Sequence, residues 1–165
     1  MDGGMHGRLN VDNRGFTLME VIAVLVLMAI FAMLAVSRQP TTDMTLRAGA
    51  EVLKSHLRYA QMRAMSSDSG WGIRYQDGQY WLFPQLQGIT RQVALPGEPQ
   101  NSVDLLSRGI SVVEGNFTLV FDPWGVPDTT ASTLSFTNRQ TILNLAKNGE
   151  TNQPIAIRQN TGFIQ

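Results

Sequence analysis

The chain has 165 residues, of which 13 are basic and 13 acidic, so its formal net charge is zero. This balance argues against a surface that binds nucleic acid generally. Cysteine is absent, which excludes a disulfide framework and a thiolate metal site.

The amino-terminal region joins a short polar leader to a long apolar run. Residues 1–15 include Arg8 and Arg14, and the sixteen residues 21–36 are all apolar. Extended back by five residues, the run is long enough at about 1.5 Å of helical rise per residue to cross a hydrocarbon core of about 30 Å. We therefore expect a single membrane span over residues 16–37. Because the arginines precede it, the amino end should stay in the cytoplasm.

Glu20 is the one ionisable residue near the start of this apolar segment. An ionised carboxylate costs about 2.5–3.5 kcal/mol at the centre of a membrane helix and less near its end. Phe16 lies four residues before Glu20, on the same helical face. A positive charge at Phe16 could therefore pair with the Glu20 carboxylate. That charge exists only if the chain is cut before Phe16, which turns its backbone nitrogen into an α-amino group.

The run Arg14-Gly15-Phe16-Thr17-Leu18, with Glu20 beside a long apolar stretch, resembles the cleavage and methylation signature of type IV prepilins and type II secretion pseudopilins. The resemblance implies that a prepilin peptidase removes the leader, residues 1–15, by cutting between Gly15 and Phe16, and that it methylates the new amino terminus of Phe16. It also implies that Glu20 pairs with the amino terminus of a neighbouring subunit during assembly. The competing interpretation is an ordinary signal anchor with a chance glutamate. A cleaved secretory signal fits less well, because the apolar run is too long.

Residues 38–67 are expected to form an amphipathic helical segment. Pro40 either bends one long helix or separates two helices, and the sequence leaves both readings open. Apolar side chains recur at alternating spacings of four and three, which predicts one buried stripe. The stripe consists of Leu46, Ala50, Leu53, Leu57, Ala60 and Ala64.

Residues 68–165 are expected to form a β-rich domain. Two strand-like runs, residues 71–75 and 79–83, flank Asp77-Gly78, a favoured pair for a type I′ hairpin turn. Further strands are expected at residues 90–95, 110–113, 117–121, 133–137, 141–145 and 155–158. A helix followed by a run of strands predicts an α+β fold with an antiparallel sheet on the helical stripe. The resemblance implies the type IV pilin version of that fold, with a long amino-terminal helix.

Two further stretches, residues 57–65 and 121–125, are similar to the minor pseudopilin H and FimT-like group. Major pilins of many type IV systems close a loop with a disulfide, which this chain lacks, so the resemblance favours a pseudopilin or minor pilin. It implies a structural subunit of a type II secretion pseudopilus, anchored in the inner membrane with its carboxyl-terminal domain in the periplasm. Its implied partners are the prepilin peptidase, other pseudopilins or pilins, and a secreted protein.

The alternative function is a minor type IV pilin of the FimT-like kind, acting in pilus biogenesis or DNA uptake. Some relatives of that kind capture DNA with arginines in the carboxyl-terminal tail. Here Arg158 is the last basic residue of the tail, which argues against a nucleic-acid partner.

The sequence predicts no enzyme and no cofactor, because it offers no nucleophile with a nearby base. His6 and His56 are the only histidines, and His6 lies in the leader, so no histidine metal site is expected. Asp122 and Asp128 could suggest calcium, but aspartate caps turns far more often.

The three tryptophans separate into two classes. Trp71 and Trp81 are expected in the core. Trp124 stands between Pro123 and Gly125 and is the candidate exposed contact for a partner.

Overall fold

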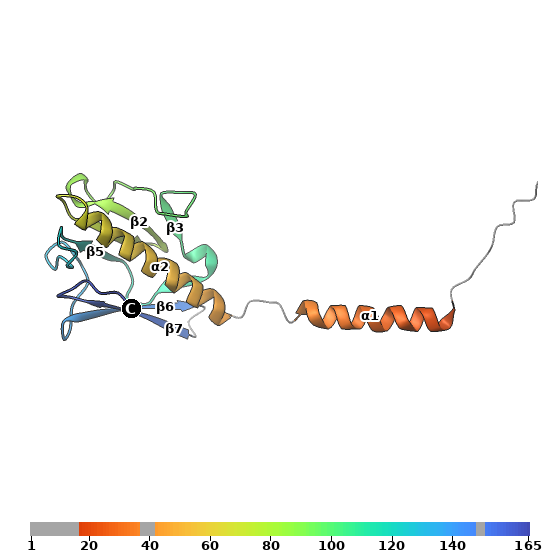
Figure 1. Cartoon of the computed structure of the whole chain (residues 1–165). Helices are drawn as coiled ribbons and strands as arrows, with labels where there is room; N and C mark the ends of the chain where they lie inside the picture. Colours follow the sequence, from red (N-terminus) through yellow and green to blue (C-terminus); the bar gives the residue numbers. More distant parts are fainter. Residues whose placement is uncertain (1–16, 37–41, 148–150) are drawn as a thin grey trace, which may run out of the picture. The chain divides into compact units, whose positions relative to one another are not determined.

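A computed structural model of the chain describes residues 17–36, 42–147 and 151–165 (Figure 1). The chain divides into two units, Met1–Gln39 and Pro40–Gln165. The predicted cleavage residues Gly15 and Phe16, and Pro40, lie outside the described residues.

The first unit contains helix α1, Leu18–Val36, in which every residue except Glu20 is apolar. The side chains of residues 17–33 are all exposed. A helix that is apolar all round is stable only when other apolar groups cover it. In the described part of the chain, no helix combines the length and the apolar character needed to cross a membrane.

The second unit begins with helix α2, Thr42–Met65, which carries the predicted apolar stripe. All six stripe residues, from Leu46 to Ala64, are buried, so this prediction is confirmed. On the solvated side of the helix, the Nζ atom of Lys54 lies 2.8 Å from Oε1 of Glu51.

The strands form two antiparallel sheets, one of four strands and one of three. The first has the order β3-β2-β1-β5, with β1 at Trp71–Gln76, β2 at Gln79–Pro84, β3 at Ser102–Asp104 and β5 at Phe117–Phe121. The second has the order β4-β6-β7, with β4 at Ile110–Val112, β6 at Gln140–Lys147 and β7 at Thr151–Arg158. Two short 3-10 helices, Gln85–Gln87 and Leu106–Arg108, complete the described elements.

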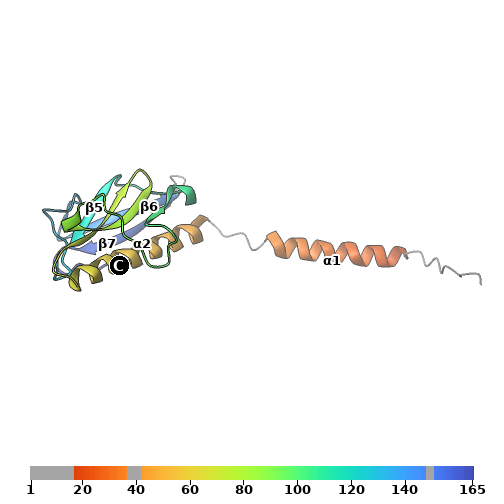
Figure 2. The ribbon, with the colours of Figure 1, turned by 90° about the horizontal axis from the view of Figure 1, so that it is seen from above.

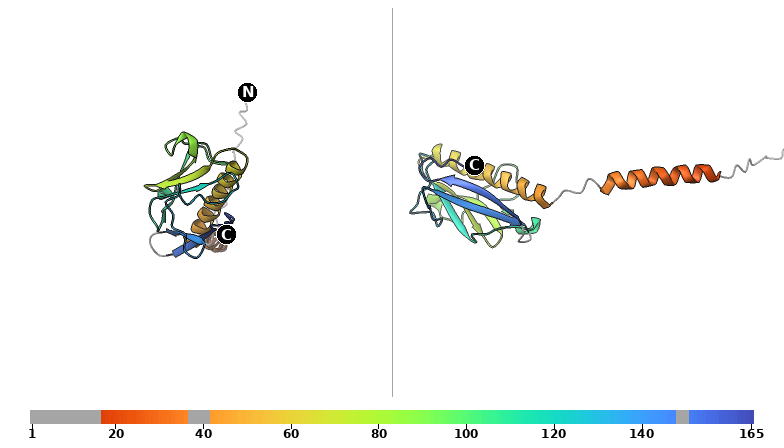
Figure 3. Two further views of the ribbon diagram at one scale, coloured as in Figure 1. Left: turned by 90° about the vertical axis from the view of Figure 1, so that its left-hand side faces the viewer. Right: turned by 90° about the horizontal axis from the view of Figure 1, so that it is seen from below.

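Helix α2 packs on strands of both sheets, and its stripe closes the core of the unit (Figure 2). Figure 3 shows the long β6–β7 hairpin in blue beside this helix. The predicted α+β fold, a helix packed on antiparallel sheets, is therefore confirmed.

The turn between β1 and β2 also follows the sequence pattern. Asp77 and Gly78 both have positive φ, at 52° and 86°, as a type I′ turn requires. The backbone N–H of Asp77 donates to Oδ1 of Asn116 at 3.0 Å, and this hydrogen bond supports the turn.

Two predicted strands do not form. Residues 90–95 contribute only one isolated bridge, between Val93 and Leu82. Residues 133–137 contribute only a bridge between Thr137 and Gln140. Strand β3 was not predicted, because its three residues are too few and too polar to show alternation.

The carboxyl-terminal tail is part of the fold. Ile164 is buried and forms an isolated antiparallel bridge with Ile157 of β7. The guanidinium of Arg58, on α2, donates to the carbonyl of Ile164 at 2.9 Å. The tail is therefore bound both to the second sheet and to the helix.

Candidate functional site

The first candidate site is the start of α1, where Glu20 occupies the first helical turn. The backbone N–H of Glu20 donates to Oγ1 of Thr17 at 3.3 Å and to the Thr17 carbonyl at 3.0 Å. Thr17 therefore acts as the N-cap, and Glu20 stands at the position that glutamate occupies in a capping box. A carboxylate is also favoured there by the partial positive charge at a helix amino terminus.

This geometry gives Glu20 a local role besides the assembly role that the sequence suggests. Its side chain is exposed in the structure and so is accessible to a partner. Phe16, whose amino group would supply the opposite charge, lies outside the described residues. The predicted cleavage after Gly15, the methylation of Phe16 and the pairing of Glu20 therefore remain predictions.

The second candidate site is the loop that carries Trp124, whose side chain is 81% exposed. Oδ1 of Asp122 accepts hydrogen bonds from the backbone N–H groups of Trp124 and Val126, both at 2.9 Å. The N–H of Gly125 donates to the Asp122 carbonyl at 2.9 Å and closes the turn. The loop is thus fixed by its own hydrogen bonds while its indole faces solvent.

Two more exposed apolar residues belong to segments that contact this loop. Met65, at the end of α2, packs against Gly125, and the carbonyl of Gly125 contacts Gly162 in the tail. Phe163 follows Gly162 and is exposed. We call Met65, Trp124 and Phe163 the Trp124 patch. The sequence did not reveal it, because these residues come from three distant parts of the chain.

Both aspartates that could have suggested calcium are engaged in turns. Oδ1 of Asp128 accepts hydrogen bonds from the hydroxyl of Thr130 at 2.7 Å and from its backbone N–H at 2.9 Å. The hydroxyl bond is the main reason why the pKa of Asp128 is lowered from its usual value. Among the described residues, no cluster of three or more histidine, cysteine or acidic side chains could hold a metal ion.

His56 is a buried structural residue. Its Nε2 lies 3.1 Å from the carbonyl of Pro96, which only accepts, so this nitrogen carries the proton. Its Nδ1 lies 2.8 Å from the hydroxyl of Tyr80, which then donates to it. Burial, and secondarily the charge of Glu98, raise the pKa of the Tyr80 phenol, so the donor stays protonated.

The tryptophans predicted in the core differ from each other. Trp71 is buried, its Nε1 donates to Oγ of Ser67 at 2.9 Å, and the Arg63 guanidinium lies 4.3 Å from its ring centroid. Trp81 is only half-buried, and its Nε1 donates to the carbonyl of Ile89 at 2.7 Å.

A basic hollow of about 290 Å³ lies at one end of the β6–β7 hairpin. It brings together Arg139 and Arg158, which are nineteen positions apart in the sequence, with Asn138, Asn160 and Thr161. Neither arginine forms an ion pair within the described part of the chain. The sequence showed Arg158 alone, because Arg139 precedes β6 whereas Arg158 ends β7, and only the pairing of the two strands brings them together.

Comparisons with known proteins agree with the two units of the chain. Residues 11–36 match the prokaryotic N-terminal methylation motif, and residues 49–159 match the family described as type II transport protein GspH. The methylation motif implies processing by a prepilin peptidase and assembly with proteins of the pilin family. Comparison with curated proteins found no significant relative.

Among solved structures, the chain is similar to the type IV minor pilin FimU of Pseudomonas aeruginosa. One crystal form has a TM-score of 0.50 with 18% identity, over 73% of this chain and 86% of that one. A second crystal form has a TM-score of 0.49 with 18% identity, over 73% of this chain and 90% of that one. At this identity the likeness shows the pilin-like fold and nothing further. Because the family match spans more than half of its residues, the chain belongs to the GspH family of type II transport proteins.

Proposed function

We propose that this protein is a minor pseudopilin, a structural subunit of the periplasmic pseudopilus of a type II secretion system, with no enzymatic activity. The observation that carries the proposal is the order of the matches. A methylation motif over residues 11–36, which includes the apolar helix α1, is followed by a GspH domain over residues 49–159.

In the proposed sequence of events, α1 first anchors the chain in the inner membrane. The prepilin peptidase then cuts after Gly15 and methylates Phe16. Helix α1 finally leaves the lipid and packs against the apolar helices of other subunits. This last step supplies the apolar cover that its exposed side chains require. Glu20 pairs with the amino terminus of a neighbour, because a carboxylate among apolar helices is tolerated only when it is paired.

The intact mass and amino-terminal sequence of the protein, isolated from the membranes of its own cells, test the proposal. A chain that begins with N-methylated Phe16 supports it. A chain that keeps residues 1–15 in cells with an active prepilin peptidase contradicts it. Gly15→Leu should block processing, whereas Gly7→Leu, within the leader but away from the junction, should not.

A second experiment separates secretion from pilus biogenesis. In a strain that lacks this protein, the export of folded exoproteins and the assembly of surface pili are measured together. Loss of export alone supports the pseudopilus, and loss of pili alone supports a minor type IV pilin.

The basic hollow favours DNA binding as a second candidate function. It provides two cations beside amide and hydroxyl groups, which suit phosphate oxygens. If the hollow binds DNA, Arg139→Gln with Arg158→Gln should reduce affinity for duplex DNA and the steepness of its salt dependence. Arg91→Gln, a change at an exposed arginine elsewhere, is the control. Equal DNA binding by the double variant and the control excludes this role for the hollow.

A further inference from the structure

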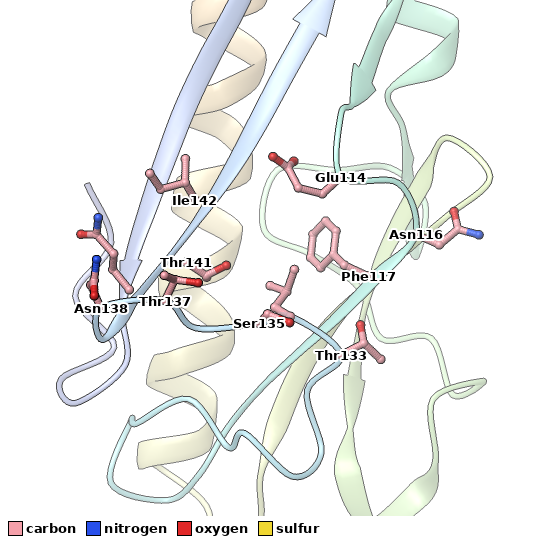
Figure 4. Close-up of a pocket in the computed structure, with 11 residues that line it drawn as sticks. Glu114, Asn116, Phe117, Thr133, Ser135, Thr137, Asn138, Thr141 and Ile142 are labelled. Atoms are coloured by element: carbon pink, nitrogen blue, oxygen red, sulfur yellow. The ribbon is translucent and has the colours of Figure 1, made fainter.

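A cleft of about 560 Å³ lies between β5 of the first sheet and β6 of the second (Figure 4). One side of the cleft is lined by Phe117 of β5, and another by Thr141 and Ile142 of β6. Residues from the segment 133–137 line the space between these two sides. Figure 4 shows these side chains around the opening between the two strands. Among the residues that line the cleft, Asn138 also lines the basic hollow described above.

One edge of β6 is paired at both ends of the cleft but not in its middle. At one end, the backbone N–H of Val113 donates to the Asn144 carbonyl at 2.9 Å, and the N–H of Asn144 donates to Oε2 of Glu114 at 2.8 Å. At the other end, Gln140 and Thr137 exchange both backbone hydrogen bonds. Since alternate residues of a strand point their backbone groups to the same edge, Ile142 faces the cleft with its N–H and C=O. Neither group has a hydrogen bond to the described residues.

The opening exists because residues 133–137 and β6, which are joined by a tight turn, pair only next to that turn and then separate. Asn138 and Arg139 form a tight turn with positive φ, and continuing its register would place Ser135 opposite Ile142. Residues 133–137 turn away instead. The N–H of Thr133 donates to the carbonyl of Thr118 in β5 at 2.9 Å. These residues are therefore tied to the first sheet, which leaves the edge of β6 open.

A free hydroxyl at the cleft adds a second, independent observation. Thr141 is only 7% exposed as a residue, but its hydroxyl oxygen is not sealed inside the protein, and it forms no hydrogen bond with the described residues. It lines the cleft, and in Figure 4 its oxygen points toward the opening. The hydroxyl is therefore available to a ligand that enters the cleft with a hydrogen-bonding group.

The charges of the cleft indicate what it accepts. Glu114 is the one ionisable residue among those that line it, and both of its carboxylate oxygens already bind Asn144, at 2.8 Å and 2.6 Å. The other polar groups are hydroxyls, amides and backbone groups. Such a lining favours an uncharged ligand that carries both N–H and C=O groups.

We propose that this cleft binds an extended, uncharged segment of a partner polypeptide. The segment lies between residues 133–137 and β6 and pairs with the N–H and C=O of Ile142, as in strand addition to a sheet edge. It also hydrogen-bonds the hydroxyl of Thr141.

The test uses the full-length chain in detergent and a synthetic peptide that copies residues 131–137, acetylated at one end and amidated at the other. This peptide is uncharged and carries the residues that the splayed hairpin would have placed opposite Ile142, but it is free of the tie to β5. Saturable binding is expected, together with slower hydrogen exchange of the Ile142 amide.

Two variants locate the binding. Ile142→Pro removes an N–H that the fold does not use, and Pro is tolerated at such edge positions. It should weaken peptide binding about tenfold, whereas Ile142→Val keeps the N–H and should bind like the wild type. Thr141→Val removes the hydroxyl at similar volume and should also weaken binding, without loss of thermal stability.

Absence of saturable binding, or equal binding by the wild type, Ile142→Pro and Thr141→Val, overturns the proposal. So does an unchanged exchange rate of the Ile142 amide when the peptide is bound. If Ile142→Pro lowers the thermal stability, Thr141→Val and the exchange rate decide the question.

Discussion

The side chain of Gln61, on α2, binds the backbone of Gly162, in the carboxyl-terminal tail, 101 positions later in the chain. Its Nε2 donates to the Gly162 carbonyl at 3.2 Å and to the Gly125 carbonyl at 2.8 Å. One amide group therefore joins the helix, the Trp124 loop and the tail.

Replacing Gln61 with Ala should lower the free energy of unfolding by about 1–2 kcal/mol, because the carbonyls of Gly125 and Gly162, and the more distant carbonyl of Thr161, lose their donor. Urea unfolding of the full-length chain measures the change. Gln92→Ala, at an exposed glutamine, is the control and should have little effect. Equal stability of the two variants would show that the amide bonds of Gln61 contribute little.

Gly162→Ala should destabilise the protein more than Gly97→Ala does. Both glycines have positive φ, at 62° and 80°, so both changes carry a backbone cost of about 1–2 kcal/mol. A Cβ at Gly162 would also collide with the Gly125 carbonyl, whereas nothing lies within 4 Å of a Cβ at Gly97. Thermal unfolding compares the two variants, and a larger loss for Gly97→Ala would contradict this prediction.

Glu20→Gln separates the two roles of Glu20. A glutamine can still accept the hydrogen bond of a capping box, but it carries no charge. If the charge sets the contact between subunits, Glu20→Gln and Glu20→Ala should both be processed normally and both fail to enter filaments or tip complexes. If Glu20 only supports the start of α1, Glu20→Gln should assemble like the wild type. Cross-linking of the assembled subunits provides the measurement.

Trp124→Ala should weaken binding to a neighbouring subunit by tenfold or more, since a buried interfacial tryptophan is commonly worth about 2 kcal/mol. Stability should change by less than about 0.5 kcal/mol, because the side chain packs on little of its own domain. Leu86→Ala is the matched control, as Leu86 is 84% exposed and lies on a different element. An equal loss of binding in both variants would exclude a specific role for Trp124.

Thr130→Val should raise the pKa of Asp128, because it removes the hydroxyl that donates to the carboxylate. NMR titration of the Asp128 carboxyl measures this directly. The folded state lowers this pKa, so Asp128 stabilises the fold above its unfolded pKa of about 3.9. The contribution is lost as the pH falls through the lower, folded value. Below that range the stability difference between the wild type and Asp128→Asn should therefore shrink.

Local sequence signals predicted the elements that depend on local chemistry. The stripe of α2 follows from helical spacing, and the β1–β2 turn follows from the conformational freedom of Asp77-Gly78. The N-cap of α1 is less evident from the sequence, because Thr17 also belongs to the cleavage motif.

Pairing between distant segments could not be predicted in the same way. Residues 133–137 alternate like a strand, but the bond between Thr133 and Thr118 draws them from β6 toward β5. The neighbourhood of Arg139 and Arg158, like the Trp124 patch, also arises from tertiary contacts. Sequence spacing carries no information about such contacts, because the packing of the whole core determines which distant segments meet.

The binding of the tail to α2 has a consequence for the order of folding. Arg58 bonds to Ile164, 106 positions later, so the core closes only when nearly all of the second unit has been made. Contacts of such long range slow folding, because a large loop must close before they form. Until then, the apolar stripe of α2 stays uncovered and prone to aggregation.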